Sequence, residues 1–243
     1  MASPSIDQQT LNVIVAVCVI LLTLVFYLIY KRVKGSKRGI LLTGICGGGK
    51  TLIYSRLVLD AFKNTYTSIK ENVSEYITDG GSSVQLVAIP GHERLREKFF
   101  AQYVEHARGI IYVIDSVTVQ KEIKDVAEFL YNILTDPKTL SNCNKMLIFC
   151  NKHDKPTAKG AGIIKTLLEK ELNTLRTTKS HGLFSTDGED PSKVYLGSPA
   201  ADFVFAQLYP LEVEFGEGFA NEGDEKEGNY DLEQLLTWIE KVS

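Results

Sequence analysis

Cysteine is scarce in this sequence, and positive charge does not predominate. Only four cysteines occur among 243 residues, and none forms a C-x-x-C pair, so neither a disulfide framework nor a zinc site is predicted. The formal net charge is -3 at pH 7, which leaves no overall positive field to hold DNA or RNA. Because 44% of the residues are hydrophobic and 23% are charged, the composition is that of a globular protein. Direct binding of nucleic acid is therefore not expected.

Charge is absent altogether from residues 11–30, an apolar run of 20 positions. Fourteen of these are Leu, Ile, Val or Phe, and an α-helix of this length spans a hydrocarbon core of about 30 Å. A signal peptide and a buried core helix are the alternatives. A signal peptide carries its basic residues before the apolar run, whereas residues 1–10 contain a single charged side chain, Asp7. The run is predicted to be a transmembrane helix.

Five Lys and Arg residues follow the apolar run, within residues 31–38. By the positive-inside rule they place the C-terminal side of the helix in the cytosol and the short N-terminus in the lumen or exterior. The predicted organisation has four parts: an N-terminal tail (1–10), a transmembrane helix (11–30), a basic linker (31–38) and a cytosolic domain (39–243).

Short apolar runs alternate with amphipathic patterns from residue 39 onward. Continuous apolar strands of this kind belong in a sheet that is covered on both faces, and apolar residues three and four apart indicate helices. The pattern predicts an α/β domain with a mostly parallel sheet and helices on both faces. Strands are expected at residues 39–43, 74–78, 84–89, 109–115, 145–150 and 211–215. Helices are expected at residues 51–62, 122–134, 162–175 and 231–242.

The sequence GICGGGKT, residues 44–51, lies between a predicted strand and a predicted helix and fits G-x-x-x-x-G-K-[ST]. Glycines let the backbone wrap an anion closely, and the N–H groups at the start of the helix point at phosphates. A glycine-rich turn without a ligand is the alternative, but such a run of glycines is entropically costly unless its permissive dihedral angles are used. The predicted phosphate ligands are Gly44, Gly47, Gly48, Gly49 and Lys50, with the Thr51 hydroxyl on Mg²⁺.

The sequence CNKHD places Asn151, Lys152 and Asp154 directly after another buried strand. Guanine presents two adjacent N–H donors, which one carboxylate accepts, whereas adenine has an acceptor lone pair there. Asp154 would therefore select GTP over ATP, while Asn151 ties this loop to the phosphate cradle and the Lys152 stem packs over the base. Taken alone, the four-residue pattern N-K-x-D would also fit a solvated polar turn.

Together the two motifs resemble the small GTPases of the Ras and Arf type over residues 39–243. The resemblance implies a P-loop GTPase fold with bound GTP and Mg²⁺. It also implies that Ser68, or the adjacent Thr67, is the Mg²⁺ ligand of the first switch, and that the Gly91 N–H meets the γ-phosphate. His92 stands where a catalytic residue orients the attacking water. An exposed loop histidine with no such role is the alternative for His92.

Two departures from this family bear on chemistry. Ala88 stands where the family usually has an Asp that supports the Mg²⁺ site, so metal affinity should be lower. The guanine-contacting S-A-K loop of the family appears here as residues 219–221, which keep only Ala220. Contact with the base is then expected from backbone N–H groups. With no arginine finger evident in the sequence, slow GTP hydrolysis at most is expected.

A membrane helix, a basic linker and an Arf-like domain containing PGHE, residues 90–93, are together similar to the beta subunits of the signal recognition particle receptor. This resemblance implies a single-pass protein of the endoplasmic reticulum membrane, with a lumenal N-terminus. It implies a GTP-dependent switch that holds the N-terminal domain of the receptor's alpha subunit for co-translational targeting. Contact with the ribosome and the signal recognition particle would be indirect. The alternatives are a GTPase with active turnover and an Arf-like trafficking GTPase with an unusual anchor.

Overall fold

The computed structural model describes residues 12, 14, 17–27, 39–62, 64–183, 195–222 and 228–243. It divides into an N-terminal unit, Met1–Arg38, and a second unit, Gly39–Ser243. The boundary between the units coincides with the end of the predicted basic linker.

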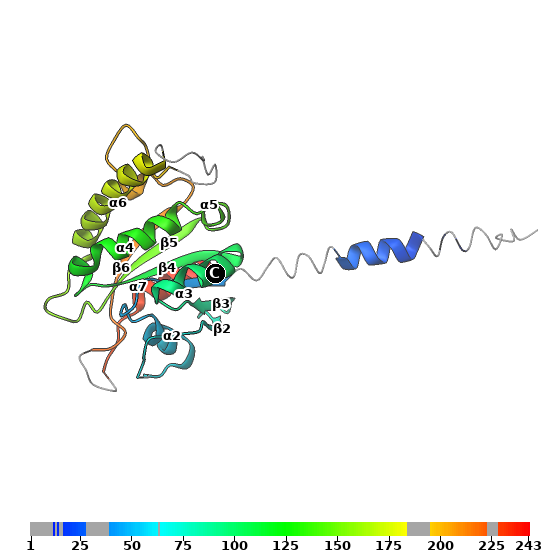
Figure 1. Ribbon diagram of the computed structural model, residues 1–243. Coiled ribbons are helices and arrows are strands. Elements are labelled where there is room, and N and C mark those ends of the chain that lie inside the picture. Colours follow the sequence, from blue (N-terminus) through cyan, green and yellow to red (C-terminus); the bar gives the residue numbers. More distant parts are fainter. Residues whose placement is uncertain are drawn as a thin grey trace, which may run out of the picture. The chain divides into compact units, whose positions relative to one another are not determined.

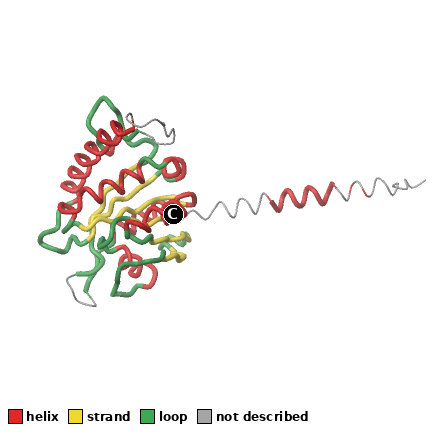
Figure 2. Tube along the Cα trace, in the orientation of Figure 1, coloured by secondary structure: helices red, strands yellow, loops and turns green. Residues whose placement is uncertain are grey.

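The second unit contains a six-stranded sheet. Figures 1 and 2 show the sheet with helices packed around it. Its strand order is β2-β3-β1-β4-β5-β6, and only β2 runs antiparallel to its neighbour. The strands are β1 (Gly39–Thr43), β2 (Asn72–Ile77), β3 (Ser83–Ala88), β4 (Ala107–Asp115), β5 (Lys145–Asn151) and β6 (Glu212–Glu217). The mostly parallel sheet predicted from the sequence is confirmed, and the strand expected at residues 74–78 corresponds to β2.

Helices cover both faces of the sheet (Figure 1). They are α2 (Lys50–Leu59), α3 (Glu93–Tyr103), α4 (Val119–Leu134), α5 (Pro137–Asn142), α6 (Ala161–Leu183) and α7 (Glu233–Val242), with short 3₁₀ turns η1 (Val104–His106) and η2 (Phe205–Gln207). Successive residues of a strand point to opposite faces, so Tyr112 belongs to the core that includes residues of α3, α4 and α6, whereas Val113 belongs to the core that includes residues of α2 and α7. Two separate apolar cores result, which explains why the inner strands are apolar throughout.

Two helices were not predicted. The segment that forms α3 buries only Arg96 and Phe100, so its sequence shows little apolar periodicity. The short helix α5 begins with Pro137 at its first position, and Asp136 caps it by accepting a hydrogen bond from the Thr139 N–H at 3.1 Å. Helix α6 also runs to Leu183, beyond residue 175, where the predicted helix ends.

The N-terminal unit is described only in part. Residues 17–27 are helical and their side chains are exposed. Among the described residues, no helix is both long and apolar enough to span a membrane. Residues 11, 13, 15–16 and 28–30 of the predicted transmembrane segment, and all of residues 1–10 and 31–38, lie outside the described residues.

Candidate functional site

The glycine-rich loop lies between the end of β1 and the start of α2, where its backbone requires glycine at two positions. Gly44 has φ 133°, and a Cβ there would collide with the carbonyl oxygen of Val113 in β4. Gly49 has φ 92°, and its missing Cβ leaves the space taken by the Asn151 side-chain amide. These dihedral angles and close approaches make the loop a cradle that ordinary side chains would fill. The geometry fits an anion held against backbone N–H groups.

Lys50 is the first residue of α2 and is buried beneath the loop. Its Nζ donates a hydrogen bond to the Ile45 carbonyl at 2.6 Å. Burial lowers the pKa of Lys50 to about 8; Cys46 opposes this shift and the nearby Arg96 adds to it. A desolvated cation without a carboxylate partner attracts an anion strongly.

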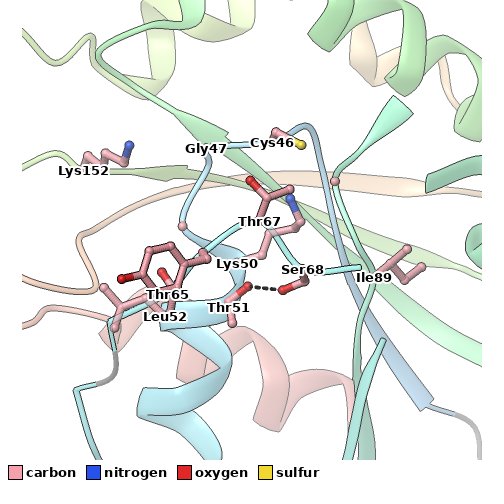
Figure 3. A pocket seen from close by; sticks show the side chains of 13 residues that line it. Cys46, Gly47, Lys50, Thr51, Leu52, Thr65, Thr67, Ser68, Ile89 and Lys152 are labelled. Atoms are coloured by element: carbon pink, nitrogen blue, oxygen red, sulfur yellow. Dashed lines mark hydrogen bonds between the residues drawn. The ribbon is translucent and has the colours of Figure 1, made fainter. Parts of the chain in front are cut away.

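A cavity of about 310 Å³ opens above this lysine. Its lining includes residues of the glycine-rich loop, Lys50 and Thr51 of α2, and the segment 65–68 (Figure 3). The Oγ atoms of Thr51 and Ser68 lie 3.0 Å apart, within hydrogen-bond distance, and Thr67 lines the same cavity. Hydroxyl groups facing each other in this way suit a Mg²⁺ ion that takes its other ligands from phosphate and water.

A second cavity, of about 340 Å³, adjoins the first, and Gly49, Leu52 and Lys152 line both. The first is called the phosphate cavity, and the second is called the base cavity. The remaining residues that line it are Phe62, Asn151, Asp154, Lys155, Ala220 and Asn221. The cavity therefore brings together both predicted base-recognition segments, 151–154 and 219–221. An aromatic ring, a carboxylate and backbone N–H groups are the groups that a purine base requires.

Asn151 joins the two cavities. Its Nδ2 donates to the Gly48 carbonyl at 2.8 Å, and its Oδ1 accepts from the Ala220 N–H at 3.2 Å. The predicted tie between Asn151 and the phosphate cradle is confirmed. The second hydrogen bond, to the loop at residue 220, was not predicted.

Asp115, at the end of β4, is a site residue that sequence reasoning missed. It is 6% exposed, its Oδ2 accepts a hydrogen bond from Lys152 Nζ at 2.5 Å, and its Oδ1 accepts one from the Val117 N–H at 2.9 Å. The register of the sheet pairs Asp115 with Asn151, which brings Lys152 within its reach. A carboxylate at the carboxyl end of a neighbouring parallel strand was the available signal.

Phe62 was also missed, because it was assigned to the predicted helix 51–62. Helix α2 instead ends at Leu59, and Asp60 adopts a left-handed conformation with φ 46°. The turn takes Phe62 out of the helix and into the lining of the second cavity. The spacing of apolar residues continues to residue 62, so the sequence does not reveal that the helix ends at Leu59.

Gly91, whose N–H is expected to meet the γ-phosphate, is buried against the glycine-rich loop. A Cβ on Gly91 would lie 2.6 Å from Lys50 Nζ and 2.7 Å from the Cys46 N. His92 is exposed and is not among the residues that line the phosphate cavity. It caps α3, and its Nδ1 accepts a hydrogen bond from the Arg94 N–H at 3.3 Å. A catalytic role for His92 therefore stays a prediction.

Ala88, at the end of β3, is 3% exposed and packs in the apolar core between the sheet and α2. No described residue that lines the phosphate cavity is acidic. Within the described part of the chain, no three His, Cys, Asp or Glu side chains are grouped to hold a metal ion. Any Mg²⁺ here must therefore take most of its ligands from the nucleotide and from water.

Known proteins resemble this chain along most of its length. The family model for the signal recognition particle receptor beta subunit matches residues 35–212. The human signal recognition particle receptor subunit beta is 42% identical over 239 residues, which cover 98% of this chain and 88% of the human protein.

Solved structures agree in fold. "The Structure of the Mammalian SRP Receptor" matches with a TM-score of 0.72 and 37% identity, over 85% of this chain and 100% of that chain. A Chaetomium thermophilum structure, "Signal recognition particle receptor SRb-GTP/SRX complex", matches with a TM-score of 0.67 over 84% of this chain and 100% of that chain. At 20% identity the second likeness shows the fold alone. From the family model and the human relative together, the chain belongs to the signal recognition particle receptor beta subunit family.

Proposed function

We propose that residues 39–243 bind GTP with Mg²⁺ and act as the GTP-dependent switch of the signal recognition particle receptor. The observation that carries this proposal is the pair of adjoining cavities, one built for phosphates and one for a purine base, which share Gly49, Leu52 and Lys152. A nucleoside triphosphate likewise consists of a phosphate chain and a base, which would occupy the two adjoining cavities. Family membership supports the same function.

Each part of the nucleotide has a counterpart in the site. Lys50 and the N–H groups of the glycine-rich loop face the phosphates, while the Thr51 and Ser68 hydroxyls are placed for the metal ion. The Asp154 carboxylate accepts the two adjacent N–H donors of guanine, and Phe62 bounds the base.

Hydrolysis is slow in this proposal, because little in the site stabilises charge that develops on the γ-phosphate. The described residues that line the cavity supply no carboxylate to help hold Mg²⁺, and His92 is exposed and caps α3. Phosphoryl transfer depends on charge neutralisation and on a positioned water. Bound GTP therefore acts mainly as a signal that orders the segments at Ser68 and Gly91.

The ordered surface holds the N-terminal domain of the receptor's alpha subunit. Tyr66 and Ile69, next to Ser68, are 89% and 75% exposed, and Val73 and Ile77 on the edge strand β2 are exposed as well. Apolar side chains gathered beside a nucleotide-sensing segment suit a partner interface. Membership of the signal recognition particle receptor beta subunit family supports this assignment.

Residues 11–30 anchor the protein in the endoplasmic reticulum membrane as a single transmembrane helix, with residues 1–10 in the lumen and the GTP-binding domain in the cytosol. The support is the charge-free apolar run and the five cations that follow it. The ribosome and the signal recognition particle are then contacted only through the alpha subunit.

Binding of GDP should weaken as the pH rises through about 8, because burial holds the pKa of Lys50 there and the phosphates bind its cationic form. Titrations from about pH 7 to about pH 9 should show affinity falling toward about tenfold per pH unit above the pKa. Lys50→Arg is the control, since arginine stays charged over this range. Equal pH slopes for both proteins would contradict the assignment.

Ile69→Glu should weaken binding of the alpha-subunit N-terminal domain by at least about tenfold, because it places a charge in an apolar interface. GTP affinity should not change, since Ile69 is not among the residues that line the phosphate cavity. Ile163→Glu, at a 56% exposed position on α6, is the matched control. Capture of the partner by nucleotide-free protein as efficiently as by GTP-loaded protein would count against a GTP switch.

Single-turnover measurements on the purified full-length protein should give unaided GTP hydrolysis no faster than about 10⁻⁴ per second, the scale of an unassisted small GTPase. The physical reason is that, in the part of the chain that the structure describes, the cavity lining has neither a carboxylate for the metal ion nor a histidine or glutamine side chain to orient the attacking water. Rapid turnover without a partner would favour the true GTPase alternative.

Leu21→Arg combined with Leu22→Arg should release the protein from microsomal membranes during alkaline extraction. Each arginine at a helix centre costs about 2.5–3.5 kcal/mol of insertion free energy. The control pair, Val33→Arg and Ser36→Arg, adds the same charge to the basic linker and should leave the protein in the membrane pellet. Retention of both variants would argue against residues 11–30 as the anchor.

A further inference from the structure

The loop that follows β6 lacks two of the side chains that guanine-contacting loops of this class carry. It is closed on itself by hydrogen bonds between Phe219 and Asp231 at 2.9 and 2.8 Å, and between the Glu222 N–H and the Asn229 carbonyl at 2.7 Å. These contacts pair its two described arms, residues 219–222 and 228–231. They do not fix its position relative to the phosphate cradle.

Arg56, on α2, supplies contacts that do. Its Nε donates to the Ala220 carbonyl at 3.2 Å, and its Nη2 donates to Asn221 Oδ1 at 3.2 Å and to the Gly228 carbonyl at 3.1 Å. A guanidinium offers several donors in a rigid plane, so one side chain holds oxygens from both ends of the loop.

The same guanidinium faces two aromatic rings. Its centre lies 4.6 Å from the centroid of Tyr230 and 5.8 Å from that of Phe62, both within the range of a cation–π interaction. Phe62 and Ala220 line the base cavity, whereas Arg56 is not among the lining residues. Arg56 therefore lies outside the base cavity and contacts two of the residues that line it, Phe62 and Ala220.

Ala220 is held on both sides of its backbone. Its N–H donates to Asn151, which is bonded to the phosphate cradle, and its carbonyl accepts from Arg56. Helix α2 also begins with Lys50 and Thr51, which face the phosphates and the metal ion. The contacts of Arg56 thus join the phosphate-binding helix to the base-binding loop.

We propose that Arg56 is a positioning residue for guanine nucleotide retention, which fixes the 220–221 backbone and Phe62 around the base in place of the side chains that the loop lacks. The inference rests on the GTP binding proposed above. Arg56 does not touch the nucleotide, so its removal should loosen the base and leave the phosphate cradle intact.

Arg56→Met tests this in the full-length protein in detergent, because methionine keeps an unbranched apolar stem and loses every hydrogen bond. We expect release of fluorescent GDP to accelerate by roughly tenfold, the effect of losing hydrogen bonds from a charged donor. Affinity for Mg²⁺-tripolyphosphate, which has no base, should stay within about twofold of wild type, since the cradle is unchanged. A general structural defect would weaken both ligands alike.

Arg176→Met is the matched control. Arg176 is a buried arginine that holds another loop by donating to the Ser198 carbonyl at 2.9 Å and to the Ala201 carbonyl, and it lines neither nucleotide cavity. Its substitution should leave GDP release unchanged. Arg56→Lys serves if the methionine variant does not fold, because lysine keeps the charge without the fork, and it too should release GDP faster.

GDP release at the wild-type rate from the Arg56 variant, or an equal loss of GDP and tripolyphosphate affinity, would overturn the positioning role. A wild-type protein that binds tripolyphosphate but shows no preference for guanine nucleotides would instead overturn the proposed GTP-binding function. The two failures are therefore distinguishable.

Discussion

The nucleotide site depends on the side-chain amide of Asn151, which is 2% exposed and uses both of its polar groups. Its nitrogen bonds the Gly48 carbonyl of the phosphate cradle and its oxygen bonds the Ala220 N–H of the base loop. A buried amide that loses a partner incurs a desolvation cost, so neither loop moves freely without the other. Gly49 completes the arrangement, because a Cβ at that position would collide with the same amide.

The motifs predicted the parts of the site that follow directly from strand ends. Lys50 follows β1 and its loop, Asn151 is the last residue of β5, and the carboxyl ends of parallel strands meet at one edge of a sheet. The phosphate cradle, the tie from Asn151 and the alternation of strands were therefore predictable from residue types and spacing. Register and helix ends were not. Asp115 reaches Lys152 because of strand register, and Phe62 reaches the base cavity because α2 stops at Leu59.

Helix α3 was missed for an energetic reason. One of its two buried residues is Arg96, whose guanidinium lies 4.7 Å from the centroid of the Phe129 ring. A helix held to the domain partly by a cation–π contact buries little apolar surface, so its sequence lacks a wide apolar stripe. His92 serves this helix as its N-terminal cap.

The buried methyl group of Ala88 connects the core to the electrostatics of the site. Because Ala88 packs against α2 rather than carrying a charge, the described lining of the phosphate cavity contains Lys50 and no acidic side chain. The pKa of Lys50 is accordingly lowered mainly by burial, with Arg96 adding to the effect. Such a site is stabilised most by a ligand that carries negative charge. A bound Mg²⁺ would take most of its coordinating atoms from that same molecule. Nucleotide and Mg²⁺ would then stabilise each other, which is the physical basis of the proposed retention of GTP over its turnover.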